Sequence, residues 1–400
     1  MHHVKVSVSL RKTLAAAIVV LCASLAAGAA SGAHGTGGGG TITLGTISIL
    51  SGPSAVIGQD DLRGATFMMD LWNKRGGVLG KQIKLIAADD ANNPAMAVPA
   101  AAKLIQDEHV VGIVGPVNSV SGISIQKLQS DSHVPAVAYQ SGAEALTAGH
   151  SPWVFRSCPT LNASFGGLAQ FEIKKLHKRR LAFIGWDLAA GSSSLAGTKA
   201  IAARFPQASV VYEKQLPLTT QDFSGVIADA KAKNPDVVLI GAPMPFAGVL
   251  AKQIRQSGWN VTIGASGDFL TTDFGQFLGS SVNGIYMTDN AHWKASMSRK
   301  VGRAFVKAWM AKYHRPPDAN ELVGADAMGI MLNGIQKAKS TDGDEIQQTI
   351  HKVGYNGVRF FVQYDANGNI KHTPIPAVVW RNGQVQLVQK DVFAVARKHK

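Results

Sequence analysis

Short, apolar, β-rich runs alternate with longer helical patterns along most of this 400-residue chain, and no other feature restricts its fold as strongly. Strands separated by helices form mostly parallel sheets whose two faces the helices cover. The first series predicts strands at 42–50, 83–88, 110–114 and 134–138, with helices at 64–75, 95–106 and 119–130. The second predicts strands at 181–185, 209–215, 236–240 and 262–265, with helices at 164–176, 193–205, 223–232 and 248–258. The fold class is therefore α/β, with two doubly wound parallel-sheet lobes.

The chain passes between the predicted lobes through the extended segment 153–159, where Pro159 disfavours helix and suits a hinge. After a strand at 286–288 the pattern becomes helical again, and we expect this part to return to the first lobe. Its helices are predicted at 296–313, 320–339 and 347–352. The predicted N-terminal lobe comprises 41–156 and 288–358, and the C-terminal lobe comprises 157–287 and 359–400.

The first residues have the pattern of a secretory signal peptide. Lys5, Arg11 and Lys12 precede an apolar run at 14–27, and small residues follow up to Ala33. That run is shorter than the roughly 20 residues that span a bilayer. We therefore predict a cleaved signal at 1–33 and a glycine-rich linker at 34–40.

Cysteine usage excludes an internal disulfide in the mature chain. Cys22 lies in the predicted signal, and Leu21 before it argues against a lipid anchor, whose signal needs a small residue there. Cys158 then remains alone, so we interpret it as a small apolar side chain and not as a nucleophile.

The charge balance of 40 Lys+Arg against 26 Asp+Glu gives a net charge of +14, which raises the question of an anionic partner. The basic residues cluster at 174–180, where a helical pattern ends, and at 397–400, which form a tail. Both clusters are typical of solvated faces. We expect no nucleic-acid partner.

Ligands of open parallel sheets bind beyond the carboxyl ends of the strands, where loops and helix starts converge. In the first series the polar candidates there are Asn118, Ser119, Ser121, Gln140, Ser141 and Gly142. The Ser119 hydroxyl can bind an anionic ligand group, cap the following helix, or do both. The loop 139–143 forms either an adjoining wall of the site or a plain polar connection.

In the second series Asp187, Ser266 and Asp268 follow strands. The two aspartates either meet a cationic or hydrogen-bonding ligand group or are ordinary solvated loop residues. Metalloprotease, paired-cysteine, serine-hydrolase and dinucleotide-binding motifs are all lacking, and the histidines are scattered. We therefore predict no catalytic residue, no metal and no cofactor.

An ordered set of motifs gives the chain a resemblance to a known family. They include Ile47-Ser48-Ile49-Leu50-Ser51-Gly52-Pro53, Asn73-Lys74-Arg75-Gly76-Gly77-Val78-Leu79-Gly80, Gly112-Ile113-Val114-Gly115 and Tyr364-Asp365-Ala366-Asn367-Gly368. Together they resemble the periplasmic leucine/isoleucine/valine-binding protein family over nearly the whole mature chain. The resemblance implies a type I periplasmic binding fold with three crossovers, a ligand between the lobes, a periplasmic location, and delivery to the membrane permease of an ABC importer. We also expect a monomer.

The resemblance also assigns site positions. Ser119 matches the serine that holds a ligand carboxylate, and Gly142, with Ser141 beside it, stands where a threonine or serine contacts the ligand. The acidic residue that holds the amine aligns near Ser266, with Asp268 as a possible substitute. Aromatic pocket positions correspond to Ile57, Pro243 and Ala325, and the family's cysteines to Asn92 and Asn118.

These positions leave an amino acid, a carboxylate or an amide as the expected solute. An ammonium buried without a carboxylate partner costs several kcal/mol, and Ser266 tolerates an amine-free ligand better. Two other functions stay open from the sequence: a ligand-sensing subunit for a regulator or receptor, and a hydrolase that uses Ser119 or Asp187.

Overall fold

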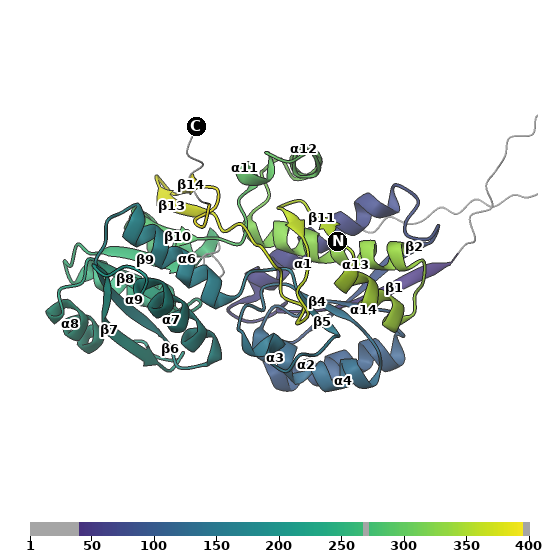
Figure 1. Cartoon of the computed structure of the whole chain (residues 1–400), viewed down its shortest axis with the longest axis horizontal. Coiled ribbons are helices and arrows are strands. Elements are labelled where there is room, and N and C mark those ends of the chain that lie inside the picture. Colours follow the sequence, from purple (N-terminus) through teal and green to yellow (C-terminus); the bar gives the residue numbers. More distant parts are fainter. Residues whose placement is uncertain (1–39, 267–271, 395–400) are drawn as a thin grey trace, which may run out of the picture. The chain divides into compact units, whose positions relative to one another are not determined.

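The structure is a computed structural model and describes residues 40–266 and 272–394. The predicted signal peptide at 1–33, most of the linker, Asp268 and the tail at 397–400 lie outside these residues. Within the described residues the strands form a five-stranded sheet, a seven-stranded sheet and a small two-stranded sheet (Figure 1). We call the parts built on the two larger sheets the first and the second lobe. None of the described helices is long and apolar enough to cross a membrane.

The five-stranded sheet of the first lobe is parallel throughout and has the order β2-β1-β3-β4-β5. Chain order reverses between β1 and β3, so the loops after these two strands diverge to opposite faces of the sheet. The elements of this part are β1 (Thr41–Ser48), α1 (Ala55–Asn73), β2 (Gln82–Asp89), α2 (Pro94–Ala102), the π-helix η1 (Lys103–Asp107), β3 (Ile113–Val114), α3 (Ser119–Ser124), α4 (Gln126–Asp131), β4 (Ala136–Ala138), α5 (Ala145–Ala148) and β5 (Val154–Arg156).

The seven-stranded sheet of the second lobe has the order β14-β13-β10-β9-β8-β6-β7, and chain order reverses here between β6 and β8. Its strands β6 to β10 are parallel. The elements are α6 (Leu161–Lys174), β6 (Arg180–Trp186), α7 (Ala189–Ala202), β7 (Ser209–Leu216), α8 (Ser224–Ala232), β8 (Val237–Gly241), α9 (Phe246–Gln256), β9 (Thr262–Ser266), α10 (Thr272–Leu278), the 3-10 helix η3 (Gly279–Val282) and β10 (Ile285–Thr288).

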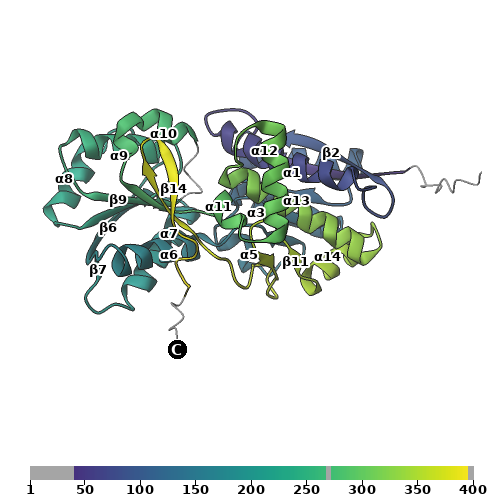
Figure 2. The same ribbon diagram turned by 90° about the horizontal axis from the view of Figure 1, so that it is seen from above.

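The chain then returns to the first lobe before it ends on the second sheet. Strand β13 pairs antiparallel with β10, and β14 pairs antiparallel with β13. The elements are α11 (Trp293–Ser296), α12 (Lys300–Tyr313), α13 (Ala319–Ala338), α14 (Gly343–Lys352), β11 (Tyr355–Asn356), β12 (Phe361–Val362), β13 (Ala377–Arg381) and β14 (Gln384–Gln389). Figure 2 shows α12, α13 and α14 grouped with α1, away from α6 to α9.

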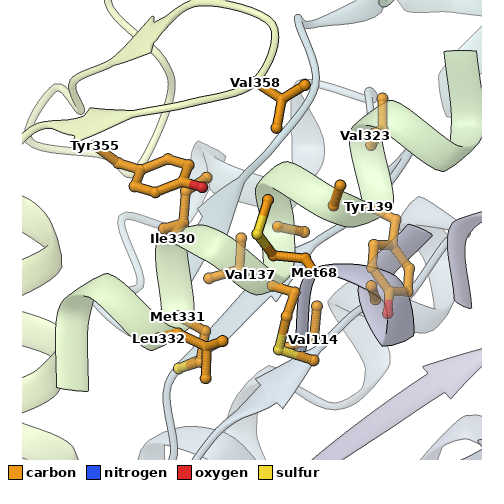
Figure 3. Close-up of a cluster of buried hydrophobic side chains, with 14 of the residues drawn as sticks. Met68, Val114, Val137, Tyr139, Val323, Ile330, Met331, Leu332, Tyr355 and Val358 are labelled. Carbon is orange, nitrogen blue, oxygen red and sulfur yellow. The ribbon is translucent and has the colours of Figure 1, made fainter. Parts of the chain in front are cut away.

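Helices cover both faces of each large sheet, as the sequence predicts. In the first lobe α1, α12 and α13 pack on one face, and the apolar side chains of α2 and α4 pack on the other. Figure 3 shows the first of these cores, where Met68, Val137 and Met331 meet from α1, β4 and α13. This core continues to Val362 and Tyr364, beyond residue 358 where the sequence analysis places the lobe boundary.

Several helices begin earlier than the sequence predicts, and α1 and α7 show why. Helix α1 begins at Ala55 and α7 at Ala189, against predicted starts at 64 and 193. Each has a glycine in its first turn that lies against the end of the preceding strand. A Cβ on Gly58 would lie 2.2 Å from the carbonyl oxygen of Ile49, and one on Gly191 would lie 2.0 Å from that of Trp186. Only glycine allows these close approaches.

Three segments connect the lobes, and a buried arginine joins two of them. The crossovers are 157–160, 289–292 and 365–376. Arg359 donates to the carbonyl oxygens of Ser157 in the first and Asn290 in the second. Its Nε also donates to Asp326 of α13, at 2.8 Å. One guanidinium therefore anchors both crossovers to the first lobe.

Candidate functional site

A pocket lies at the ends of the strands between which chain order reverses, which are β1 and β3 in the first lobe and β6 and β8 in the second. From the first lobe the loops after β1 and β3, with the first turns of the helices that follow them, contribute Ser54, Ile57 and the residues from Val117 to Val120. From the second lobe come Trp186 at the end of β6, Leu188 in the loop after it, and Pro243 in the loop after β8. The pocket holds about 770 Å³, its open mouth included. Its position and size are typical of small-molecule sites in α/β proteins.

The lining is apolar with a few uncharged polar groups. Ile49, Ile57, Ile123, Leu161 and Leu188 supply much of the apolar surface. The polar side chains are those of Ser54, Asn92, Asn118, Ser119 and Gln140, with the indole of Trp186. Among the described residues that line the pocket there is no aspartate, glutamate, histidine, lysine or arginine. The described lining therefore offers no general acid or base.

Ser119 lies at the pocket but does not cap the helix that it begins. The side-chain oxygen of Asn118 accepts the backbone N–H of Val120 at 2.8 Å, so Asn118 is the cap of α3. The Asn118 amide also donates to the Asn92 side chain at 2.5 Å. The Ser119 hydroxyl accepts the backbone N–H of Ala143 at 3.1 Å, which leaves its own hydrogen available to donate to a ligand.

Gln140 lines the pocket, but its side-chain amide is already hydrogen-bonded to other residues of the protein. Its nitrogen donates to Asp61 at 3.2 Å and to Asn320 at 3.0 Å, and its oxygen accepts from Asn290 at 2.5 Å. Burial raises the pKa of Asp61 well above its usual range. The bonds to Asp61 and Asn320 occupy both donor hydrogens of Gln140. Its bond with Asn290 links the pocket wall to the second crossover.

The remaining predicted site residues are placed as follows. Gly142 lines the pocket, whereas the buried Ser141 donates to the carbonyl oxygens of Pro116 and Val117 and does not line it. Ser121 is buried beside Asp90. Asp187 is exposed and Ser266 is buried at the end of β9, and neither lines the pocket. Asp268 lies outside the described residues.

The second-lobe wall consists mainly of residues that the sequence analysis did not select. Trp186 is the last residue of β6, and Leu188, Ala189 and Ala190 come directly after it, as the rule for parallel sheets would have indicated. Their apolar character gave no chemical signal, so Asp187 was selected from the same loop instead.

An acidic cluster, two of whose residues line a different pocket, is paired with arginines. Carboxylate oxygens of Asp60, Asp318 and Glu321 lie within 4.8 Å of one another, an arrangement that could hold a metal ion. Arg63 forms an ion pair with Asp60 and, at 2.7 Å, with Glu321, and Arg315 also pairs with Glu321. Asp318 and Glu321 also form the capping box of α13. We interpret the cluster as structural.

Comparison with known proteins decides the family. The model of the family described as periplasmic binding protein matches residues 41–384. The chain belongs to this family. The Leu/Ile/Val-binding protein BraC3 of Rhizobium johnstonii is 30% identical over 325 residues, which cover 78% of this chain and 87% of that protein. The predicted relationship is thereby confirmed.

Two solved structures confirm the type I periplasmic binding fold. The leucine-binding protein LivK of Thermotoga maritima has a TM-score of 0.80 at 24% identity, covering 86% of this chain and 97% of its own. A solute-binding protein of an ABC transporter from R. palustris, in complex with benzoate, has a TM-score of 0.77 at 22% identity. That match covers 88% of this chain and 96% of the R. palustris chain.

Proposed function

We propose that this periplasmic binding protein captures a small solute between its two lobes and delivers it, chemically unchanged, to the membrane permease of an ABC importer. One observation carries the proposal. The pocket is lined by strand-end loops of both lobes, and its described lining contains no ionisable side chain. A site with this lining can enclose a solute, and the described residues that line it offer no general base to activate a nucleophile.

The crossovers supply the movement that such a protein needs. A solute that contacts both lobes favours the conformation in which the lobes approach, and a permease can recognise that conformation. Hinge residues absorb the backbone rotation, and here they lie at 157–160, 289–292 and 365–376.

The proposed location is the periplasm, after removal of the segment 1–33. The first test is a thermal-shift screen of the mature chain against amino acids, aliphatic and aromatic carboxylates, and amides. A solute at about 100 times its Kd should add about 2.7 kcal/mol to the free energy of unfolding. Isothermal titration calorimetry then gives the affinity. If no solute of these classes stabilises the protein, the proposal is wrong.

Two further measurements separate this function from the others that the sequence left open. Mass spectrometry of the solute before and after incubation should show no turnover, whereas a hydrolase would convert it. Uptake of the labelled solute by cells that lack the gene should fall, whereas a purely sensing protein would leave uptake through a constitutively expressed importer unchanged.

A further inference from the structure

A basic surface lies at the end of β6 that is opposite to the pocket. Two segments form it, the end of α6 with the turn after it and the end of α8 with the turn after it. Its cations are Lys174, Lys175, Lys178, Arg179, Arg180, Lys231 and Lys233. Arg180 begins β6 and Trp186 of the pocket ends it, so about 20 Å of strand separate this basic surface from the pocket.

Hydrogen bonds hold the two segments together. The Arg180 guanidinium donates to the carbonyl oxygens of Lys233 and Asn234, at 2.7 and 2.9 Å. The Asp236 carboxylate accepts the backbone N–H groups of Arg179 and Arg180, at 2.7 and 2.9 Å. Only the first segment stands out as basic in the sequence, and the fold brings the second one beside it.

The lysines of the basic surface are free to meet a partner. None of their five ammonium groups forms a hydrogen bond or an ion pair within the described part of the chain. Glu172 beneath them is fully buried, and the exposed Asp229 of α8 forms no ion pair with them. Like charges gathered in this way repel one another. An anionic partner would remove that repulsion.

A membrane surface fits these charges better than a nucleic acid does. Lysine ammonium groups are point charges on flexible stems, and they suit the diffuse negative charge of lipid headgroups. Each lysine or arginine close to such a surface strengthens binding by about fivefold. The predicted signal peptide takes the chain away from nucleic acids, and the proposed function brings it to the membrane that carries its permease.

We propose that this basic surface binds the anionic phospholipid headgroups of the membrane and leaves the pocket open to solute. The proposal goes beyond solute capture, and it rests on the proposed function only for the place where the protein meets that membrane.

Vesicles test the contact without any solute. The mature chain is sedimented with vesicles of phosphatidylcholine alone, or of phosphatidylcholine with about 30 mol% phosphatidylglycerol. We expect at least about tenfold tighter binding to the anionic vesicles, and loss of that binding as NaCl rises from about 0.05 to about 0.5 M. Equal binding to both vesicles, or binding to neither, overturns the proposal. Tighter binding to a DNA duplex than to the anionic vesicles, at equal phosphate and salt, also overturns it.

Two variants with the same loss of charge test the location. One removes three lysines of the basic surface, and the other removes three exposed lysines of α12 and α13 in the first lobe. They are Lys174→Gln with Lys175→Gln and Lys233→Gln, and Lys300→Gln with Lys307→Gln and Lys337→Gln. The first variant should bind anionic vesicles at least about tenfold more weakly than wild type, and the second less than about threefold more weakly. Equal losses in the two variants overturn the assignment to the second lobe.

Calorimetry with a solute from the screen separates this proposal from the proposed function. The variant of the basic surface should keep the wild-type affinity for that solute within about twofold, because its changes lie far from the pocket. If a solute binds but anionic vesicles do not, the membrane contact is wrong and the proposed function stands. If anionic vesicles bind but no solute of the screen does, the proposed function is wrong and the membrane contact stands.

Discussion

Arg359 and Asp326 form an ion pair at the junction of the crossovers, with 2.8 Å between Nε and Oδ2 and side-chain exposures of 2% and 0%. Asp326 also accepts the backbone N–H groups of Val358 and Arg359. Because Arg359 also donates to the carbonyl oxygens of Ser157 and Asn290, the pair anchors two of the three crossovers to the first lobe.

Removing the arginine should be severely destabilising. Arg359→Met leaves the Asp326 carboxylate buried without its counter-ion, so we expect the free energy of unfolding to fall by about 3–5 kcal/mol. Urea denaturation followed by circular dichroism measures the change. Lys199→Met, which breaks an ion pair with Glu213 exposed at 54% and 45%, should change it by less than about 1 kcal/mol. Similar losses in the two variants would contradict the proposed importance of the buried pair.

Ser119→Ala should weaken binding of the solute by about 1–3 kcal/mol, because the hydroxyl is a donor at the pocket. Calorimetry with a solute found in the screen measures the effect. Ser192→Ala serves as the control, because this exposed serine is on α7 and does not line the pocket. An unchanged affinity in Ser119→Ala would remove this residue from the site.

The buried carboxyl of Glu172 predicts that stability falls as the pH rises from acid to about 8. Both oxygens of this fully buried carboxyl lack hydrogen-bond partners in the described structure, and burial raises its pKa from 4.5 to about 8. The folded chain therefore holds the proton more tightly than the unfolded chain, and the stability that this gives is lost as the pH rises between about 4.5 and about 8. Glu172→Gln should remove this part of the pH dependence. Parallel stability curves of wild type and variant from pH 5 to 9 would contradict the assignment.

The contact between α1 and α13 leaves no room for a methyl group at Gly324. A Cβ at this position would lie 1.9 Å from the backbone oxygen of Asp61 in α1. Gly324→Ala should therefore lower the free energy of unfolding by at least about 2 kcal/mol. In Gly225→Ala on α8, where a Cβ would meet nothing within 4 Å, we expect no loss and a gain of up to about 1 kcal/mol. Thermal or urea denaturation of both variants decides whether the close contact is the cause.

The periodic segments made the architecture predictable from the sequence. Strands such as β6 and β8 are apolar runs of ordinary length, and their alternation with helices leaves few topologies open. The first turns of α1 and α7 were not predicted, because Gly58 and Gly191 resemble helix-breaking residues in a sequence. Their close contacts with the preceding strands become visible only in three dimensions.

Which polar residues face the pocket was harder to predict than the fold, because this too depends on contacts in three dimensions. A serine or an amide after a strand can face the pocket or the protein, and the sequence does not say which. Ser119 lies at the pocket, Ser141 is used by two backbone carbonyls, and both donor hydrogens of Gln140 are held by Asp61 and Asn320. Trp186 was not selected because an indole at a strand end usually belongs to the core.

The contact of α1 with α13 has a consequence for redesign of the protein. Ser54 directly precedes α1 and Ile57 lies in its first turn, and the backbone of α1 touches α13, so this side of the pocket cannot move away from a larger ligand. Leu188 on the facing side is 48% exposed and is free of such constraint. Redesign for a bulkier compound should therefore begin by replacing Leu188 with a smaller residue, while Ser54 and Ile57 on the opposite side are left unchanged.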